Sequence, residues 1–315
     1  MNSTSNRQRV LITGAAGLVG QNLIPKLADD PELELLAVDK HPANTKILKK
    51  LHPDVEVIQS DLSQCGAWEN SLGHIDVLVI LHAQIGGLDE HAFEANNVEA
   101  TRNILDAAKA AGVQYIVHVS SSVVFSKADD YYTRSKKAQE LLVTQCGIPQ
   151  IILRPTLMFG WFDRKHFGWL KRFMHAAPIF PIPGHGRYLR QPLYAGDFSA
   201  IIKACISNRP EGSYNISGLE KTYYIDLVRK IKQVTSARAL IVSIPFKLFY
   251  GLLSIYALFD KNPPFTTNQL KALVIPETFE TIDWPSRFNV QATPLQRALE
   301  LTFKDPVYSE IVLEY

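Results

Sequence analysis

The chain has 315 residues, of which 46% are hydrophobic and 20% charged, with 17 glycines and 18 prolines. These proportions are those of an ordinary globular protein and argue against a disordered, collagen-like or solenoid chain. The length predicts two domains or one large one. The 33 basic and 31 acidic residues leave a net charge of +2, so the chain lacks the broad basic surface typical of nucleic-acid-binding proteins.

The cysteines and the N-terminal residues indicate the compartment. Cys65, Cys146 and Cys205 are odd in number, far apart in the sequence and without CxxC spacing. This pattern argues against a disulfide framework and against a metal site, so we expect reduced thiols. Residues 1–9 are polar and run directly into an apolar strand, with no hydrophobic segment of signal-peptide length. We therefore expect a cytoplasmic protein.

The first 160 residues alternate short apolar runs with longer helical patterns. A nearly uninterrupted apolar run, such as residues 76–81, is typical of a strand that is buried on both faces. Alternating strands and helices favour an α/β fold with a doubly wound parallel sheet of the Rossmann type. The expected strands are 9–13, 34–39, 55–59, 77–82, 115–120 and 150–154. Three helices are expected: one that ends near residue 28, one over 98–111 and one that begins at Tyr132.

A glycine-rich turn follows the first expected strand and opens a helix. Gly14, Gly17 and Gly20 have the spacing that lets the backbone turn tightly and approach a pyrophosphate at the helix N-terminus. Asp39 ends the second strand, where a carboxylate binds ribose hydroxyls and repels a 2′-phosphate. These residues predict a dinucleotide site that prefers NAD, with NADP the less favoured cofactor.

Tyr132 and Lys136 are four residues apart on an expected helix and therefore share one face. An ammonium group beside a phenol favours the phenolate and lowers the tyrosine pKa from its usual value of about 10. Tyr132 is therefore a candidate general base that removes a hydroxyl proton during hydride transfer. The serines at 120–122 end the preceding strand and offer a hydroxyl group to the same substrate oxygen.

With these motifs the sequence resembles the extended short-chain dehydrogenase/reductase family, in its sugar-nucleotide epimerase, dehydratase and reductase branch. The resemblance covers almost the whole chain and implies that Ser121 is the catalytic hydroxyl and that Lys136 also binds the nicotinamide ribose. It also implies a homodimer formed by the helices near 97–111 and 132–146. The NAD-binding residues that it implies are Gly14, Gly17, Leu18, Val19, Gly20, Asp39, Asp61, Leu62, Leu81, Ala83, Asn97 and Lys136.

Departures from the family pattern narrow the reaction. The family's 4,6-dehydratases carry Asp-Glu after the catalytic serine, whereas this chain has Ser122 and Val123, so dehydration is not expected. The resemblance implies a substrate diphosphate on Arg190, and Ser122 and Arg187 are further candidates for substrate contact. Leu157 replaces a family asparagine that often contacts the sugar nucleotide, and the interval of 11 residues from Ser121 to Tyr132 is short.

Three functions follow from these residues. The leading hypothesis is an NAD-dependent oxidoreductase or epimerase that acts on a nucleotide sugar. The second is a reductase or dehydrogenase of a non-nucleotide or lipid-linked alcohol, which the leucine at 157 and the short loop favour. The third is a non-catalytic dinucleotide-binding assembly subunit, and the presence of Ser121, Tyr132 and Lys136 together counts against it.

The second half of the chain is expected to form a smaller, interleaved substrate-binding lobe. We expect the NAD-binding domain over 7–160, the lobe over 161–315, and a return of 188–217 to the first domain. The run 161–173 mixes aromatic and basic residues and is interpreted as a helix of the lobe, and 180–186 as a loop. Residues 245–259 carry only one charge, but a segment of this length is too short to span a bilayer. We interpret them as a buried helix, with an interfacial membrane helix as the less favoured alternative.

Overall fold

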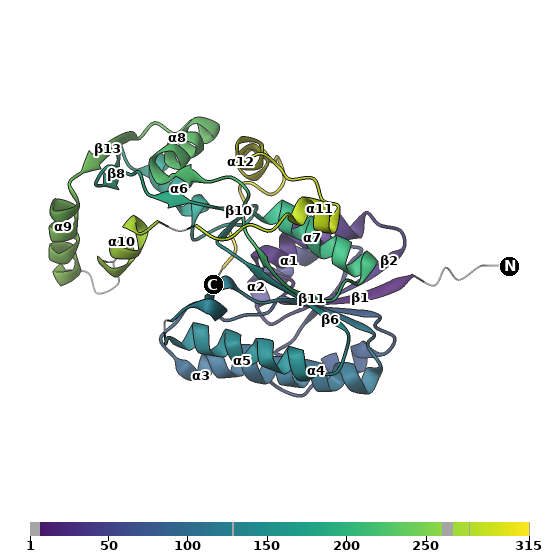
Figure 1. Cartoon of the computed structure of the whole chain (residues 1–315). Helices are drawn as coiled ribbons and strands as arrows, with labels where there is room; N and C mark the ends of the chain where they lie inside the picture. The colour runs from purple at the N-terminus through teal and green to yellow at the C-terminus, as the bar shows by residue number, and fades with distance from the viewer. Residues whose placement is uncertain (1–6, 128, 260–266, 277, 315) are drawn as a thin grey trace.

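The computed structural model describes residues 7–127, 129–259, 267–276 and 278–314. At its centre is a seven-stranded parallel sheet with the order β11-β6-β5-β4-β1-β2-β3 (Figure 1). This arrangement confirms the predicted doubly wound parallel sheet. The strands are β1 (Gln8–Thr13), β2 (Leu33–Asp39), β3 (Glu56–Gln59), β4 (Val77–Ile80), β5 (Tyr115–Val119), β6 (Gln150–Pro155) and β11 (Gly212–Ile216).

Helices cover both faces of the sheet (Figure 1). On one face lie α1 (Leu18–Ala28), α2 (Pro42–Leu51) and α7 (Ala195–Asn208), and on the other lie α3 (Glu90–Phe93), α4 (Ala100–Ala111) and α5 (Tyr131–Gln145). Alternate residues of β1 point to opposite faces of the sheet: Val10 and Ile12 pack toward α1 and α7, whereas Leu11 packs toward α4. Burial on both faces explains why the strands are almost entirely apolar in sequence.

The remaining helices and short strands form a second lobe. Its buried core joins α6 (Phe167–Ala176), α8 (Tyr224–Thr235) and α12 (Leu295–Lys304). As expected, α6 places aromatic side chains such as Phe167 in this core, but the helix predicted over 161–173 begins only at Phe167. The loop predicted over 180–186 is wrong in its first half, because β8 (Ile179–Pro183) pairs in parallel with β13 (Leu240–Ile244). The short strands are β7 (Met158–Phe159), β9 (Leu189–Arg190), β10 (Leu193–Tyr194) and β12 (Thr222–Tyr223).

The two lobes are interleaved along the chain. After α6 and β8 the chain returns to the sheet, where α7 packs beside α1 and β11 pairs with β6 at the sheet edge. A short helix near the C-terminal end, α11 (Trp284–Phe288), also packs on the sheet layer and buries Trp284 there. Three short turns complete the fold: η1 (Ala67–Leu72), η2 (Glu94–Glu99) and η3 (Ser122–Phe125).

The apolar segment 245–259 does not form a buried helix. It forms α9 (Phe246–Phe259), which lies beside α10 (Thr267–Val274) at one end of the molecule (Figure 1). Leu248, Leu252 and Ile255 of α9 are 56%, 53% and 56% exposed. The expectation of burial was wrong because the helix stands at the edge of the lobe, with its outer face toward solvent. Among the described residues, no helix is long and apolar enough to cross a membrane.

Candidate active site

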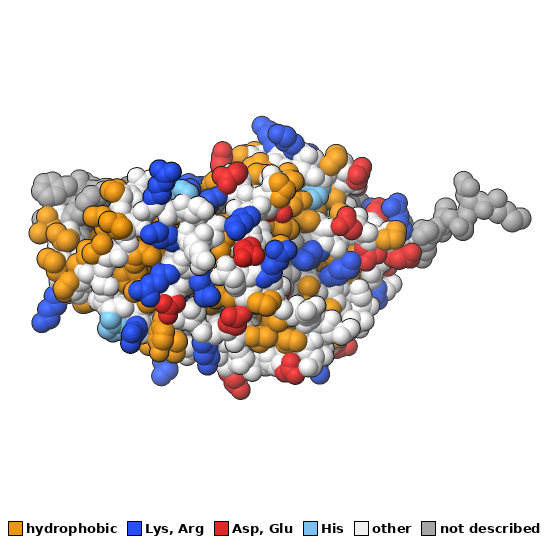
Figure 2. All heavy atoms as spheres, turned by 90° about the horizontal axis from the view of Figure 1, so that it is seen from above, with side chains coloured by type: hydrophobic (Ala, Val, Ile, Leu, Met, Phe, Trp, Pro, Cys, Tyr) orange, Lys and Arg blue, Asp and Glu red, His pale blue; other side chains and the backbone are white. Residues whose placement is uncertain are grey.

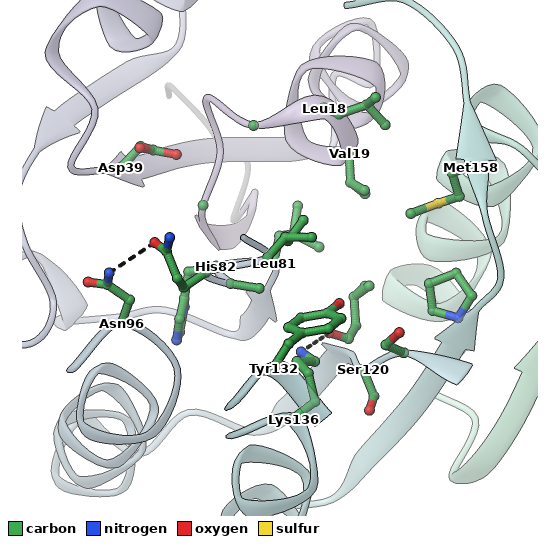
Figure 3. A pocket seen from close by; sticks show the side chains of 18 of the residues that line it. Leu18, Val19, Asp39, Leu81, His82, Asn96, Ser120, Tyr132, Lys136 and Met158 are labelled. Carbon is green, nitrogen blue, oxygen red and sulfur yellow. Dashed lines mark hydrogen bonds between the residues drawn. The ribbon is translucent and has the colours of Figure 1, made fainter. Parts of the chain in front are cut away.

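A cavity of about 500 Å³ lies at the carboxyl ends of β1, β2, β4 and β5 (Figure 3). The strand order reverses between β1 and β4, and ligands of doubly wound sheets bind at such a reversal. The cavity brings together most of the residues singled out in the sequence. Those that line it are Gly14, Gly17, Leu18, Val19, Asp39, Asp61, Leu62, Leu81, Ala83, Ser121, Ser122, Tyr132 and Lys136.

The glycine turn forms one wall of the cavity. Gly14 has φ +66°, and a Cβ atom there would lie 2.5 Å from the backbone nitrogen of His82, so the position requires glycine. Gly17 is the N-cap of α1, which leaves unpaired N–H groups of the helix N-terminus at the cavity. These groups and the helix dipole favour a bound anion, so the turn fits the pyrophosphate of a dinucleotide.

Asp39 is fixed at the end of β2. Its carboxylate accepts hydrogen bonds from the backbone N–H groups of Ala16 and His41, over 3.0 Å and 2.9 Å. Burial raises the pKa of Asp39, and these two hydrogen bonds oppose the rise. The carboxylate therefore holds the glycine turn and faces the cavity at the end where a ribose would bind (Figure 3).

Two residues predicted to bind the cofactor lie behind the cavity wall. Gly20 is inside α1, where a Cβ atom would lie 2.3 Å from the carbonyl oxygen of Ala15, so its role is close packing of helix against turn. Asn97 is fully buried and its side-chain amide pairs with both backbone groups of Gln84 and with the hydroxyl of Ser135. Asn97 thus shapes the segment after β4 that lines the cavity.

Tyr132 and Lys136 lie together at the other side of the cavity (Figure 3), which Ser121 also lines. The hydroxyl group of Ser121 lies close enough to Tyr132 to influence the pKa of its phenol. The two residues come from different elements, since Ser121 follows β5 and Tyr132 lies in the first turn of α5, which Asp130 caps. Lys136 lies one turn further along α5, on the same face as Tyr132, as the sequence spacing indicated.

The structure also distinguishes the three serines. Ser120 lines the cavity, but its hydroxyl donates a 2.6 Å hydrogen bond to Glu140, which also pairs with Arg154. Ser122 lines the cavity at the start of η3. Ser121 is the serine whose side chain influences the pKa of the Tyr132 phenol, which agrees with the assignment made from the family pattern.

The electrostatics of Tyr132 differ from the expectation. Burial raises the pKa of Tyr132, the Ser121 hydroxyl opposes this, and Asp130 adds to it. Burial also lowers the pKa of Lys136 to about 7, with Glu140 opposing. Lys136 donates its hydrogen bonds to the carbonyl of Val119 and to Gln139. The predicted lowering of the Tyr132 pKa is therefore wrong for the protein alone, because burial outweighs the opposing effect of Ser121.

A buried hydrogen-bond network extends from Lys136 under the cavity. Gln139 accepts from Lys136 and donates to the hydroxyl of Thr101 over 2.8 Å. The two ring nitrogens of His82 pair with the hydroxyls of Thr101 and Thr13, over 3.0 Å and 2.8 Å. Burial, with a contribution from Lys136, lowers the pKa of His82 to about 3, so the ring is neutral. No local motif marks His82, because its partners Thr13 and Thr101 come from two other elements, β1 and α4.

The two arginines proposed as substrate ligands do not line this cavity. Arg187 is exposed on the second lobe. Arg190 is buried, and its guanidinium group donates to the carbonyl oxygens of Leu273 and Ile275 at the end of α10. It thus ties α10 to β9.

Two other basic side chains line the cavity, those of Lys165 and His166. They precede α6, within the run at 161–173 that mixes aromatic and basic residues.

The wall on the side of the second lobe mixes apolar side chains with the polar ones of Thr156, Asp163, Lys165 and His166. Leu157, which replaces the family asparagine, lines the cavity together with Pro155 and Met158. Ile85, in the segment after β4, also lines the cavity and is 60% exposed.

A model of the NAD dependent epimerase/dehydratase family matches residues 10–217. Ceramide reductase of Caulobacter vibrioides is 25% identical over 265 residues, which cover 82% of this chain and 79% of the relative. The 3β-hydroxysteroid dehydrogenase/Δ5→4-isomerase of Mycobacterium tuberculosis is 30% identical over 192 residues, which cover 52% of this chain and 50% of the relative.

Among solved structures, Bordetella bronchiseptica WbmG in complex with NAD has a TM-score of 0.75 at 17% identity and covers all of both chains. Because this match covers the whole of both chains, the second lobe shares the fold of that structure as well as the sheet. Because the family model covers the sheet and the residues that line the cavity, this chain belongs to the NAD-dependent epimerase/dehydratase family of extended short-chain dehydrogenases/reductases, and its cofactor is NAD.

Proposed function

We propose that the protein is an NAD-dependent oxidoreductase that transfers hydride at a hydroxyl- or keto-bearing carbon. The observation that carries the proposal is that Tyr132, Ser121 and Lys136 line one cavity whose far wall is the glycine turn and Asp39. In this assignment Ser121 positions the substrate oxygen and Tyr132 exchanges a proton with it. Bound NAD supplies the hydride donor or acceptor, and Lys136 lies on the side where the nicotinamide ribose would bind.

Protonated Tyr132 can act as the general acid in the reductive direction. Because burial raises its pKa, Tyr132 carries its proton at neutral pH and is ready to donate it to a carbonyl oxygen. Reduction of a ketone requires such a general acid, whereas oxidation of an alcohol requires the phenolate. We therefore propose that this protein acts as a reductase, without dehydration, since Ser122 and Val123 supply no second acid/base pair.

We propose that the substrate is a lipid-type ketone or alcohol. The lobe-side wall of the cavity presents Leu157 and Met158, and Arg190 is committed to backbone carbonyl groups of the second lobe. Two relatives carry the names ceramide reductase and 3β-hydroxysteroid dehydrogenase, and both names denote lipid substrates. A nucleotide sugar is the second candidate, supported by Lys165, which offers a cation to a diphosphate at the cavity wall.

The test is turnover of NADH with a long-chain keto-sphingoid amide, a 3-ketosteroid and UDP-hexoses as separate substrates. We expect oxidation of NADH with a lipid ketone, and a decrease of about 10² to 10⁴-fold in rate for Tyr132→Phe. Tyr131→Phe, the same change one residue earlier, is the matched control and should keep the wild-type rate. Turnover or epimerisation of UDP-hexoses alone would transfer the assignment to the second candidate. Binding of NAD with no turnover of any substrate would favour an assembly subunit.

A homodimer through α4 and α5 remains a proposal. Leu141 on α5 is 56% exposed, which leaves an apolar side chain available at the expected interface. Light scattering of the purified protein measures its mass directly, and a monomer would contradict the proposal.

A further inference from the structure

Helix α9 exposes a row of large apolar side chains. Leu248, Leu252 and Ile255 are four and three residues apart, so they lie on one face of the helix, and each is more than half exposed. A helix that faces water normally carries polar residues on its outer side. Three adjacent exposed aliphatic side chains therefore indicate a surface that binds a partner or a membrane.

The strand ribbon that leads into α9 continues this surface. Leu240 and Val242 of β13 are exposed, and α9 begins two residues after the end of β13. We call Leu240, Val242, Leu248, Leu252 and Ile255 the α9 surface. Figure 2 shows hydrophobic side chains bordered by lysines and arginines at this end of the molecule.

The charge of the surrounding segment indicates what covers the α9 surface. Residues 227–259 include no aspartate or glutamate, whereas they include the five cations Arg229, Lys230, Lys232, Arg238 and Lys247. Arg229, which pairs with Asp226, and Lys232 line an open groove beside Ile241 of β13. An anionic surface complements this charge, while a second copy of the same segment would repel it.

We propose that the α9 surface binds an anionic lipid bilayer, with α9 lying in the plane of the membrane interface. The 14 residues of α9 are too few to span a bilayer, but a helix of this kind inserts its apolar face and keeps its cations at the headgroups. This surface lies on the same lobe as the cavity wall with Leu157 and Met158, so it would present the enzyme to substrates held in a membrane. Its binding needs neither substrate nor NAD, so it is independent of the proposed reaction.

The experiment is flotation of the full chain with vesicles of phosphatidylcholine alone or with added phosphatidylglycerol. We expect binding to the anionic vesicles, and a loss of affinity of about tenfold or more for L248S/L252S, because two aliphatic side chains no longer insert. V307S/V312S is the matched control, since Val307 and Val312 are similarly exposed elsewhere. Lys247→Glu should weaken binding to anionic vesicles, while Lys49→Glu on α2 should not.

Several results would overturn the proposal. Absence of flotation with anionic vesicles would do so, as would an equal loss of binding in V307S/V312S. Equal binding to neutral and anionic vesicles would remove the role of the cations. A dimer in light scattering that L248S/L252S dissociates would assign the surface to a second copy of the chain. Lipid turnover is measured separately in detergent, so failure of membrane binding leaves the proposed reaction untouched.

Discussion

The Nζ atom of Lys136 donates a hydrogen bond to the carbonyl oxygen of Val119, 3.1 Å away, inside the protein. This bond joins the helix that carries Tyr132 to the strand that leads to Ser121. It therefore fixes the relative position of the two hydroxyl groups in the cavity. The lysine is 1% exposed, so its charge is poorly solvated and its protonation depends on the fold.

The burial of Lys136 predicts a pH-dependent stability. Its pKa is lowered to about 7 in the folded protein and returns to its usual value, about 10.4, on unfolding. Between these values the unfolded chain binds more protons, so the free energy of unfolding should rise as the pH increases from about 7 to about 9. Urea denaturation should show this rise in the free energy of unfolding for the wild type and a smaller rise for Lys136→Met. The control Lys137→Met, at an exposed position, should show the same rise as the wild type. A rise in Lys136→Met equal to that of the wild type would contradict the explanation.

Asp39 should determine the choice between NAD and NADP. Its carboxylate faces the cavity and would repel the 2′-phosphate of NADP. We expect Asp39→Asn to bind NAD about tenfold more weakly, because hydrogen bonds to a charged group contribute about 1.5 to 3 kcal/mol, and to discriminate less against NADP. Fluorescence titration with each cofactor measures both effects. Asp54→Asn, at an exposed carboxylate before β3, is the control, and an unchanged preference in Asp39→Asn would place the ribose elsewhere.

Gly20 should act through packing and not through contact with NAD. A Cβ atom at this position would overlap the backbone of Ala15, so Gly20→Ala forces the helix away from the turn. We expect the free energy of unfolding to fall by about 1 to 3 kcal/mol, as for overpacked cores. The same change at Gly73, where a Cβ atom meets nothing within 4 Å, is the control. If the denaturation curves of the two variants coincided, Gly20 would not have this packing role.

Arg190 should stabilise α10 and not bind substrate. Removal of its guanidinium group in Arg190→Met leaves the carbonyl groups of Leu273 and Ile275 without this donor. We expect faster amide hydrogen exchange over 270–275 and an unchanged KM for a lipid ketone. Arg187→Met, on the exposed neighbour, should change neither quantity. A large rise in KM for a nucleotide sugar in Arg190→Met would instead support the diphosphate role implied by the family resemblance.

Much of the cofactor half could be predicted from the sequence, because its signals are local. The apolar runs of the strands, the glycine turn and the spacing of Tyr132 and Lys136 each depend on residues that are close together in the chain. The parallel sheet then brings the strand ends to one edge, which is why Asp39 and Ser121 line the same cavity. The family pattern also predicted that Gly20 and Asn97 bind NAD, but only the packed structure shows that both lie behind the cavity wall.

Tertiary structure decided the features that depend on distant contacts. The sequence determined that Tyr132 and Lys136 share a helix face, but burial by the sheet and its helices set their pKa values and reversed the expected effect. It determined that 245–259 is an apolar helix, but the position of α9 at the edge of the lobe left Leu248 and Leu252 exposed. It identified Arg190 by its motif, but α10, more than 80 residues later, supplies the carbonyl groups that hold it. Desolvation and long-range hydrogen bonds arise from the packed chain, and local spacing does not encode them.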